Sequence, residues 1–145
     1  EQGEGHIVNT ASMAGLVAVP GAAPYNVTKS AVVALSEGLF IELRNAGSPV
    51  GISALCPGFV RTNLMVGQTW QDRLGAVPPP TTNPMGVMVD QMLRAGVESG
   101  IDAADVAGAV VDAIRGEQFW ILTHPEMRRA PVERMLRAEA QENPA

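Results

Sequence analysis

Residues 12–29 read SMAGLVAVPGAAPYNVTK and end in the only tyrosine and the only lysine of the chain, Tyr25 and Lys29. The preceding segment, HIVNTA at 6–11, is short, rich in β-branched side chains and bounded by glycine, which predicts a buried strand. The following segment, 25–45, contains no proline and is closed by glycine and proline, which predicts a long helix. The quoted stretch is therefore a strand-to-helix connection.

The same alternation of elements continues along the chain. A second apolar strand is predicted at 50–56, then a helix that Asp102 caps and Gly116 ends, then a third strand at 119–123. Residues 126–145 mix Arg with Glu and are expected to form a C-terminal helix and tail with a solvated face. Strands that alternate with helices pair in parallel, so the expected fold is α/β, with about three strands and flanking helices.

The segment 64–100 interrupts this pattern. It holds three consecutive prolines and methionines at positions 65, 85, 88 and 92. We expect it to be irregular, as in a substrate loop or lid, or else disordered. Its methionines, with Trp70 and Leu74, would line a pocket for an apolar substrate, although ordinary core packing explains them equally well.

Composition narrows the classes of function. The 145 residues are 46% hydrophobic, which fits one domain with a core, and the net charge is -5 with a pI near 4.9. Because no basic face is available for phosphate groups or anionic lipid, we expect no nucleic-acid or membrane partner, which leaves small neutral substrates. One cysteine excludes an internal disulfide and fits a cytoplasmic protein. No apolar run reaches the roughly 18 residues of a membrane helix.

We interpret three further residues, Cys56 and the two histidines, as structural. Cys56 ends the second strand and is interpreted as a small buried residue, because neither His6 nor His124 is placed to activate it. The histidines have no metal-ligand spacing and are interpreted as strand-end residues. No metal site is therefore expected.

The spacing of Tyr25 and Lys29 carries chemistry. Residues four apart in a helix share a face, so the Lys29 ammonium would lie beside the Tyr25 phenol. A nearby cation and the positive end of the helix both favour the phenolate, which prepares the tyrosine to exchange a proton near neutral pH. Such a pair also occurs by chance as a surface contact. Ser12 favours the catalytic interpretation, because it follows the carboxyl end of a strand, where ligands bind in open parallel sheets.

Three segments together resemble the short-chain dehydrogenase/reductase family: GHIVNTASMAG at 5–15, PGAAPYNVTKSAV at 20–32 and CPGFVRTNL at 56–64. The resemblance runs over essentially the whole chain but covers only the second half of that family's fold, a doubly wound parallel sheet of Rossmann type. The spacing from Ser12 to Tyr25 resembles the compact single-domain branch rather than the epimerase and dehydratase branch.

Carried over to matching positions, the resemblance assigns roles to three catalytic candidates. Ser12 would hold the substrate oxygen, Tyr25 would be the catalytic acid or base, and Lys29 would assist the tyrosine and hydrogen-bond the nicotinamide ribose. Arginine would replace Lys29 poorly, because its planar fork does not present a compact ammonium to both phenol and ribose. The same reasoning implies NAD or NADP as the cofactor, with both Tyr25 and Lys29 among the residues that bind it.

The third matching segment is expected to bind the nicotinamide end of that cofactor. Pro57 and Gly58 would line the ring, while the Val60 backbone and the Thr62 hydroxyl would hold the carboxamide. The family's glycine-rich phosphate turn would lie before residue 1. We therefore expect residues 1–145 to be the C-terminal part of one Rossmann-type domain, without the dinucleotide-binding half, and to bind cofactor poorly when isolated.

The expected function is NAD(P)-dependent interconversion of a secondary alcohol and a ketone, acting on a small apolar substrate. Helix 25–45 is apolar nearly all round, which predicts cover on two sides, by the sheet and by either a second subunit or more of the same chain. A homo-oligomer through this helix is expected. Two alternatives stay open: a non-catalytic family member that dimerises, and a dehydratase or isomerase of the same fold.

Overall fold

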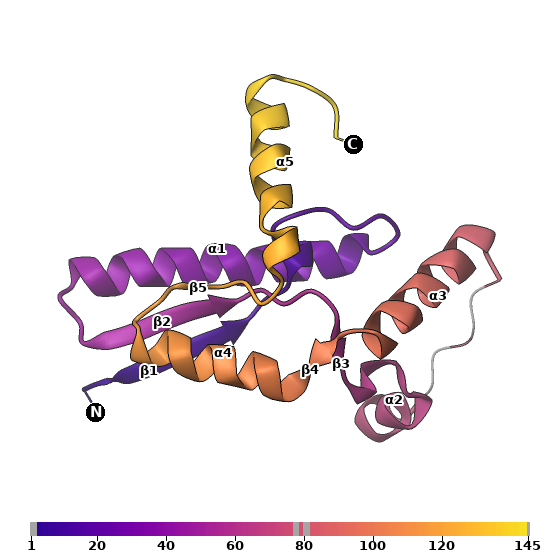
Figure 1. The fold of residues 1–145 in the computed structure, drawn as a ribbon, viewed down its shortest axis with the longest axis horizontal. Helices are drawn as coiled ribbons and strands as arrows, with labels where there is room; N and C mark the ends of the chain where they lie inside the picture. Colours follow the sequence, from indigo (N-terminus) through magenta and orange to yellow (C-terminus); the bar gives the residue numbers. More distant parts are fainter. Residues whose placement is uncertain (1–2, 77–78, 80–81, 145) are drawn as a thin grey trace. The chain divides into compact units, whose positions relative to one another are not determined.

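The computed structural model describes residues 3–76, 79 and 82–144, and the chain divides into two compact units (Figure 1). The first unit consists of Glu1–Gly58 and Ala107–Ala145, and the second of Phe59–Val106. Helix α4, Ala103–Arg115, begins in the second unit and ends in the first. Among the described residues, no helix combines the length and the apolarity needed to cross a membrane.

A parallel sheet forms the centre of the first unit. Its strands are β1 (Gly5–Thr10), β2 (Val50–Leu55) and β5 (Trp120–Ile121), in the order β1-β2-β5. Strand β1 pairs with β2 along its whole length, whereas β5 pairs with β2 over two residues. The three predicted strands and their parallel pairing are confirmed, and the third strand is shorter than the expected 119–123.

Helix α1, Ala23–Asn45, runs alongside these strands (Figure 1). It starts with Pro24 in its first turn, where the missing N–H of proline costs no hydrogen bond. Asn9 in β1 donates from Nδ2 to Ser36 Oγ at 3.0 Å, and Ser36 Oγ donates to the Val32 carbonyl at 2.7 Å. This chain of hydrogen bonds holds α1 against the sheet and gives the strand asparagine a structural role.

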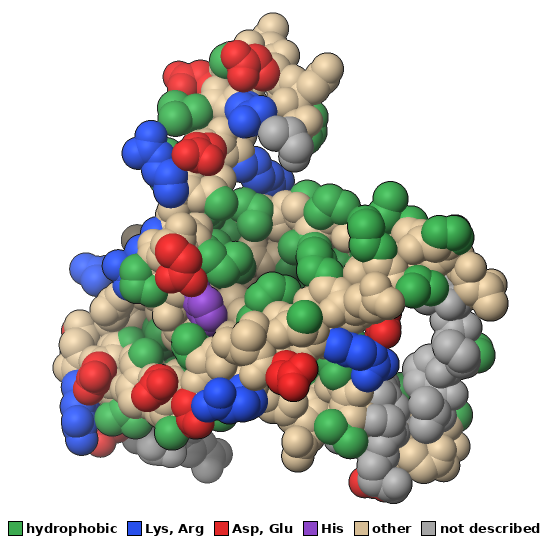
Figure 2. Space-filling view, turned by 45° about the vertical axis from the view of Figure 1, so that its right-hand side comes forward, with side chains coloured by type: hydrophobic (Ala, Val, Ile, Leu, Met, Phe, Trp, Pro, Cys, Tyr) green, Lys and Arg blue, Asp and Glu red, His purple; other side chains and the backbone are tan. Residues whose placement is uncertain are grey.

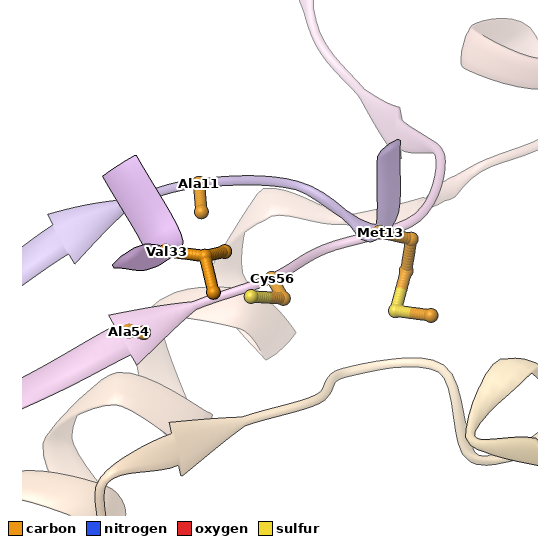
Figure 3. Close-up of a cluster of buried hydrophobic side chains, with 5 residues drawn as sticks. All are labelled: Ala11, Met13, Val33, Ala54 and Cys56. Carbon is orange, nitrogen blue, oxygen red and sulfur yellow. The ribbon is translucent and has the colours of Figure 1, made fainter. Parts of the chain in front are cut away.

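Small side chains let α1 approach the sheet closely. Five buried hydrophobic side chains, most of them small, form a cluster where α1 meets the ends of the strands (Figure 3). Burial raises the pKa of the Cys56 thiol to about 11, which agrees with its interpretation as a structural residue. The cluster consists of Ala11, Met13, Val33, Ala54 and Cys56, and Leu16, Val32, Phe119, Trp120, Leu122 and Met127 pack against it.

The second unit contains a short parallel pair of strands and two helices. Strand β3 (Val60–Arg61) pairs with β4 (Ile101–Asp102), and helices α2 (Gly67–Leu74) and α3 (Pro84–Glu98) lie between them in the chain. The expectation that 64–100 is irregular is therefore wrong for most of its described residues.

Local capping explains why a proline- and methionine-rich segment becomes helical. Asn83 Oδ1 accepts hydrogen bonds from the Met85 N–H at 2.9 Å and the Gly86 N–H at 3.3 Å, which satisfies two donors of the first turn. Pro84 occupies the first helical position, which suits its fixed backbone angle. The prolines at 78 and 80 and the side chain of Trp70 lie outside the described residues.

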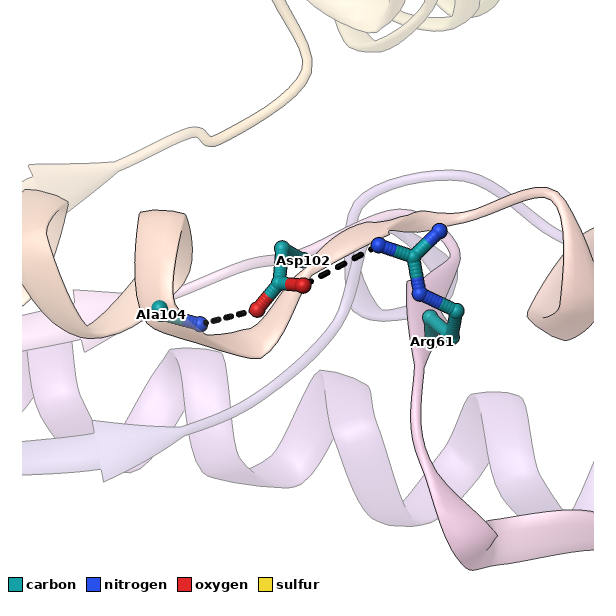
Figure 4. Close-up of polar contacts among 3 residues, drawn as sticks. All are labelled: Arg61, Asp102 and Ala104. Carbon is teal, nitrogen blue, oxygen red and sulfur yellow. Dashed lines mark hydrogen bonds and ion pairs between the residues drawn. The ribbon is translucent and has the colours of Figure 1, made fainter.

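The start of α4 is fixed by Asp102, as the sequence predicts. Its Oδ1 accepts the Ala104 N–H at 2.9 Å, and its Oδ2 accepts from Arg61 Nη2 at 3.0 Å (Figure 4). The Ala104 N–H first, and then the Arg61 guanidinium, lower the pKa of the Asp102 carboxyl. One carboxylate thus caps a helix and joins β3 to β4.

The predicted C-terminal helix is α5, Arg129–Glu139, which follows a short turn at Pro125–Met127. Positively and negatively charged side chains project from α5, with hydrophobic side chains between them (Figure 2). Arg134 Nη1 donates to the Leu16 carbonyl at 2.9 Å, which ties α5 to the loop that follows β1.

Candidate active site

Ser12 lies just beyond the carboxyl end of β1 and is buried. It caps a single helical turn at Met13–Gly15, because its Oγ accepts the Ala14 N–H at 3.1 Å. The Ser12 hydroxyl donates to the Pro57 carbonyl at 3.4 Å, and the Met13 N–H donates to the same oxygen at 2.9 Å. These contacts join the segments that follow β1 and β2.

Tyr25 and Lys29 lie on one face at the start of α1, as their spacing predicts. The Lys29 Nζ is 5.6 Å from the centroid of the Tyr25 ring, within the range of a cation–π contact. The same Nζ donates at 2.9 Å to the carbonyl of Thr10, which is the last residue of β1. Tyr25 is 46% exposed, so its phenol is accessible to a ligand.

A close backbone approach brings the segment after Ser12 onto α1. A Cβ added at Gly15 would lie 2.7 Å from the Lys29 carbonyl oxygen, so a residue without a side chain is needed there. Ser30 Oγ also donates to the Gly15 carbonyl at 3.1 Å. The segment that carries Ser12 therefore packs on the helical turn that carries Lys29.

The peptide between Pro57 and Gly58 is held from a second side. The Gly58 N–H donates to Nδ1 of His124 at 3.0 Å. Sequence reasoning treated His124 as a strand-end residue and missed this contact. The available signal was a histidine directly after the predicted strand 119–123, at the same edge of the sheet as Pro57 and Gly58.

The remaining two predicted cofactor residues belong to the second unit. Val60 lies in β3 opposite Ile101, and Thr62 is exposed. Thr62 Oγ1 accepts the Leu64 N–H at 3.3 Å and so caps the short turn at Asn63–Met65. The first unit holds the other predicted site residues, Ser12, Tyr25, Lys29, Pro57 and Gly58.

A cavity of about 700 Å³ lies at the opposite ends of the strands from Ser12. It is lined by the first residues of β1 and β2 and by the end of α1, including His6 and Arg44. His6 Nε2 is 2.7 Å from Ser53 Oγ, and that hydroxyl donates to the Gln118 carbonyl at 2.6 Å. None of the predicted site residues lines this cavity.

Comparison with known proteins assigns the chain to a family. The family model for short chain dehydrogenases matches residues 1–73, about half of the chain. The chain belongs to the short-chain dehydrogenase/reductase family. The resemblance inferred from the three sequence segments is thereby confirmed.

Individual members of the short-chain dehydrogenase/reductase family match over more of the chain. The CLA biosynthesis dehydrogenase/reductase of Lactiplantibacillus plantarum is 32% identical over 124 residues, 83% of this chain and 43% of that protein. The 1-deoxy-11-beta-hydroxypentalenate dehydrogenase of Streptomyces exfoliatus is 32% identical over 123 residues, 85% of this chain and 36% of that protein. The chain thus spans less than half the length of these relatives.

A solved structure of the same family confirms the fold. The short-chain dehydrogenase/reductase of Burkholderia phymatum, in complex with NAD, superposes with a TM-score of 0.85 at 42% identity. The match covers 97% of this chain and 50% of that one. The predicted fold class, a parallel α/β sheet of Rossmann type, is confirmed.

Proposed function

We propose that the whole protein is an NAD(P)-dependent oxidoreductase that interconverts a secondary alcohol and a ketone, with Tyr25 as proton donor and acceptor. One observation carries the proposal. The Lys29 ammonium reaches both the Tyr25 ring, at 5.6 Å, and the Thr10 carbonyl at the end of β1, at 2.9 Å, while the segment that carries Ser12 packs on the same helical turn. Membership of an oxidoreductase family supports it.

The three side chains have complementary roles in this proposal. During reduction, the Tyr25 hydroxyl gives its proton to the carbonyl oxygen of the substrate, and the positive charge of Lys29 stabilises the phenolate that remains. During oxidation, the phenolate takes the proton of the alcohol. The Ser12 hydroxyl donates to the same substrate oxygen and gives up its long 3.4 Å hydrogen bond to the Pro57 carbonyl.

The residues present fit the nicotinamide end of a dinucleotide. The hydride chemistry is what such a cofactor supplies when bound. Lys29 has three N–H donors, of which one is used by the Thr10 carbonyl, so two are left for the phenol and a ribose hydroxyl. Pro57 and Gly58 follow the carboxyl end of β2, where ligands of open parallel sheets bind. The Burkholderia phymatum relative is in complex with NAD, and both NAD and NADP are candidates here.

The second unit favours an apolar substrate. Hydrophobic side chains are exposed on α3 and on the segment that precedes α2, and this apolar surface supports our proposal that the substrate is a small apolar alcohol or ketone. In the whole protein, kcat/KM should then rise as methylene groups are added to a ketone substrate, and a flat series would contradict this. These side chains are Leu64, Val66, Met85, Met88 and Met92.

The outer face of α1 favours a second copy of the protein as partner. Val27, Leu35 and Ile41 are 69%, 57% and 58% exposed, and their spacing places them along one side of the helix. This exposed side lies opposite the side that covers the sheet, where Val33 and Ser36 are buried. We propose that the two outer faces pack together in a homo-oligomer.

Tyr25→Phe in the whole protein tests the catalytic assignment. The variant keeps the ring but removes the proton, so turnover should fall by at least about 100-fold. Cofactor affinity, measured by fluorescence titration with NADH and NADPH, should stay within about twofold because the ribose contact is assigned to Lys29. Retention of most of the activity would defeat the assignment, and a wild-type protein that binds neither cofactor would defeat the proposed function as a whole.

A further inference from the structure

His124, in the segment that follows β5, contacts the proposed site at Gly58. It lies just beyond β5, is 8% exposed, and accepts the Gly58 N–H on Nδ1 at 3.0 Å. Thr123 Oγ1 lies 2.9 Å from the same nitrogen. Two contacts therefore fix the orientation of the imidazole, one with the neighbouring Thr123 and one with Gly58, which follows β2.

The contact also selects the tautomer of the neutral imidazole. A backbone N–H only donates, so Nδ1 of His124 must carry the lone pair. The proton of the neutral ring then lies on Nε2. Tautomers of this kind are set by the hydrogen bond that the other nitrogen makes.

Close packing adds to the hydrogen bond. A Cβ at Gly58 would lie 2.8 Å from the Met127 sulfur and 2.9 Å from Cγ and Cδ2 of His124. The backbone at Gly58 thus lies directly on the imidazole, and only glycine allows this approach. Met127 in turn packs against the buried cluster of the first unit.

The Pro57 carbonyl and the Gly58 N–H belong to one planar peptide group. Its N–H donates to His124, and its carbonyl accepts from the Met13 N–H at 2.9 Å and from the Ser12 hydroxyl at 3.4 Å. Rotation of the peptide plane would break the contacts on both sides together. Removal of the imidazole leaves the plane held from one side only.

We propose that His124 is a positioning residue of the active site. By accepting the Gly58 N–H, it fixes the peptide plane whose carbonyl accepts from the Met13 N–H and, before substrate binds, from Ser12, and whose Gly58 end lines the nicotinamide. This inference rests on the proposed function for the roles of Ser12 and Gly58, and on the contacts above for the role of His124.

The first test is the protonation of His124 in the unmodified whole protein. In a ¹⁵N-histidine-labelled sample, long-range ¹H–¹⁵N NMR at neutral pH should show an unprotonated Nδ1 and a protonated Nε2 for His124. A His124→Leu variant identifies the His124 signal among those of the other histidines of the whole protein. A proton on Nδ1 would overturn the proposal, whether or not the protein turns over any substrate.

The second test compares two variants of the whole protein. His124→Leu removes the acceptor of a part-buried N–H, so both kcat and cofactor affinity should fall on the order of tenfold, with little change in KM for the alcohol. His124→Asn should restore most of the loss, because its amide oxygen branches from Cγ as Nδ1 does. Partial rescue of this kind is not expected from a residue that only fills space.

The matched control is His6→Leu, which removes the other histidine and its contact with Ser53 Oγ at the opposite end of the strands. It should lower the melting temperature as His124→Leu does, while kcat and cofactor affinity stay unchanged. Equal kinetics for His124→Leu and wild type would overturn the positioning role. Absence of cofactor binding by the wild type would instead overturn the proposed function, and with it the catalytic part of this inference.

Discussion

Tyr25 and Cys56 both carry a side chain that can lose a proton, and both lie near the carboxyl ends of the strands. Tyr25 is 46% exposed, whereas Cys56 is 0% exposed and belongs to the buried cluster. Desolvation, the largest effect, raises the pKa of the Cys56 thiol to about 11. The phenol is therefore available to a ligand, and the thiol is kept neutral and out of reach.

Cys56 should resist alkylation in the folded protein. Its raised pKa keeps the thiolate fraction very small at pH 8, and burial blocks access, so iodoacetamide labelling followed by mass spectrometry should be at least about 100-fold slower than in urea. The unfolded thiol has a pKa of about 8.5. The stability contributed by the neutral thiol is thus complete below that pH and is lost as pH rises towards 11. Fast labelling of the native protein would contradict this.

Gly15→Ala should destabilise the protein. The added Cβ would lie 2.7 Å from the Lys29 carbonyl oxygen, and backbone on both sides has to move, so the free energy of unfolding should fall by about 1–3 kcal/mol in urea denaturation. Gly108→Ala in α4 is the matched control, because a Cβ there meets no atom within 4 Å. That variant should be as stable as wild type or up to about 1 kcal/mol more stable.

At the scale of elements, one carboxylate organises the second unit. Asp102 caps α4 through the Ala104 N–H and pairs with Arg61 of β3, and all three groups are solvent-exposed. An exposed ion pair contributes little to stability, whereas a capping bond satisfies a helix donor that has no other partner. We therefore attribute the role of Asp102 chiefly to the cap.

The stabilisation by Asp102 should depend on pH. The pKa of its carboxyl is lowered in the folded state, so its contribution is present above the ordinary carboxyl pKa and is lost as pH falls through the acid range. Melting temperatures should show Asp102→Ala below wild type at pH 7, with a gap that narrows towards pH 3. Asp102→Asn, which keeps an acceptor for the Ala104 N–H, should lie between them. A gap independent of pH would contradict the assignment.

Asp112→Asn is the matched control for this experiment. Asp112 lies on the same helix and makes only a 4.0 Å contact with Arg115. Its removal should leave the melting temperature nearly unchanged at both pH values. A drop as large as that of Asp102→Ala would mean that any loss of charge on α4, rather than the loss of the cap, is what destabilises the protein.

At the scale of the whole molecule, the apolar outer face of α1 is the surface through which we propose that two copies of the protein assemble. Leu35→Glu places a charge at the centre of this face, and burial of an unpaired charge is strongly unfavourable. Sedimentation of the whole protein should show an oligomer for wild type and a smaller species for Leu35→Glu. Met135→Glu, on the exposed hydrophobic side of α5, is the control and should leave the mass unchanged. A monomeric wild type, or an unchanged Leu35→Glu, would contradict the proposed interface.

The sequence predicted those parts of the fold that depend on local signals. The β-branched run before Ser12 predicted β1, and Asp102 predicted the start of α4, because strand propensity and capping act over a few residues. The helices inside 64–100 were not predicted, because prolines and methionines dominate the composition of this segment. The hydrogen bonds by which Asn83 caps α3 were found only in the structure.

Sequence reasoning likewise predicted only part of the candidate site. The spacing of Tyr25 and Lys29 predicted a shared helix face, and the family resemblance added the roles of Ser12 and Gly58. The contact between Gly58 and His124 spans 66 positions of sequence and depends on the order of strands in the sheet. No local pattern encodes it, so only the three-dimensional structure reveals it.

The parallel register of the sheet has a consequence for how the chain folds. Gly5 pairs with Val50, 45 positions later, and Ala54 pairs with Trp120, 66 positions later. Within the described part of the chain, no two paired strands are joined by a hairpin, so each pairing requires closure of a long loop before any ladder hydrogen bond forms. During synthesis, residues 56–119 must follow β2 before β5 can pair with it. Folding should be slow, and its early species should leave strand edges exposed to chaperones.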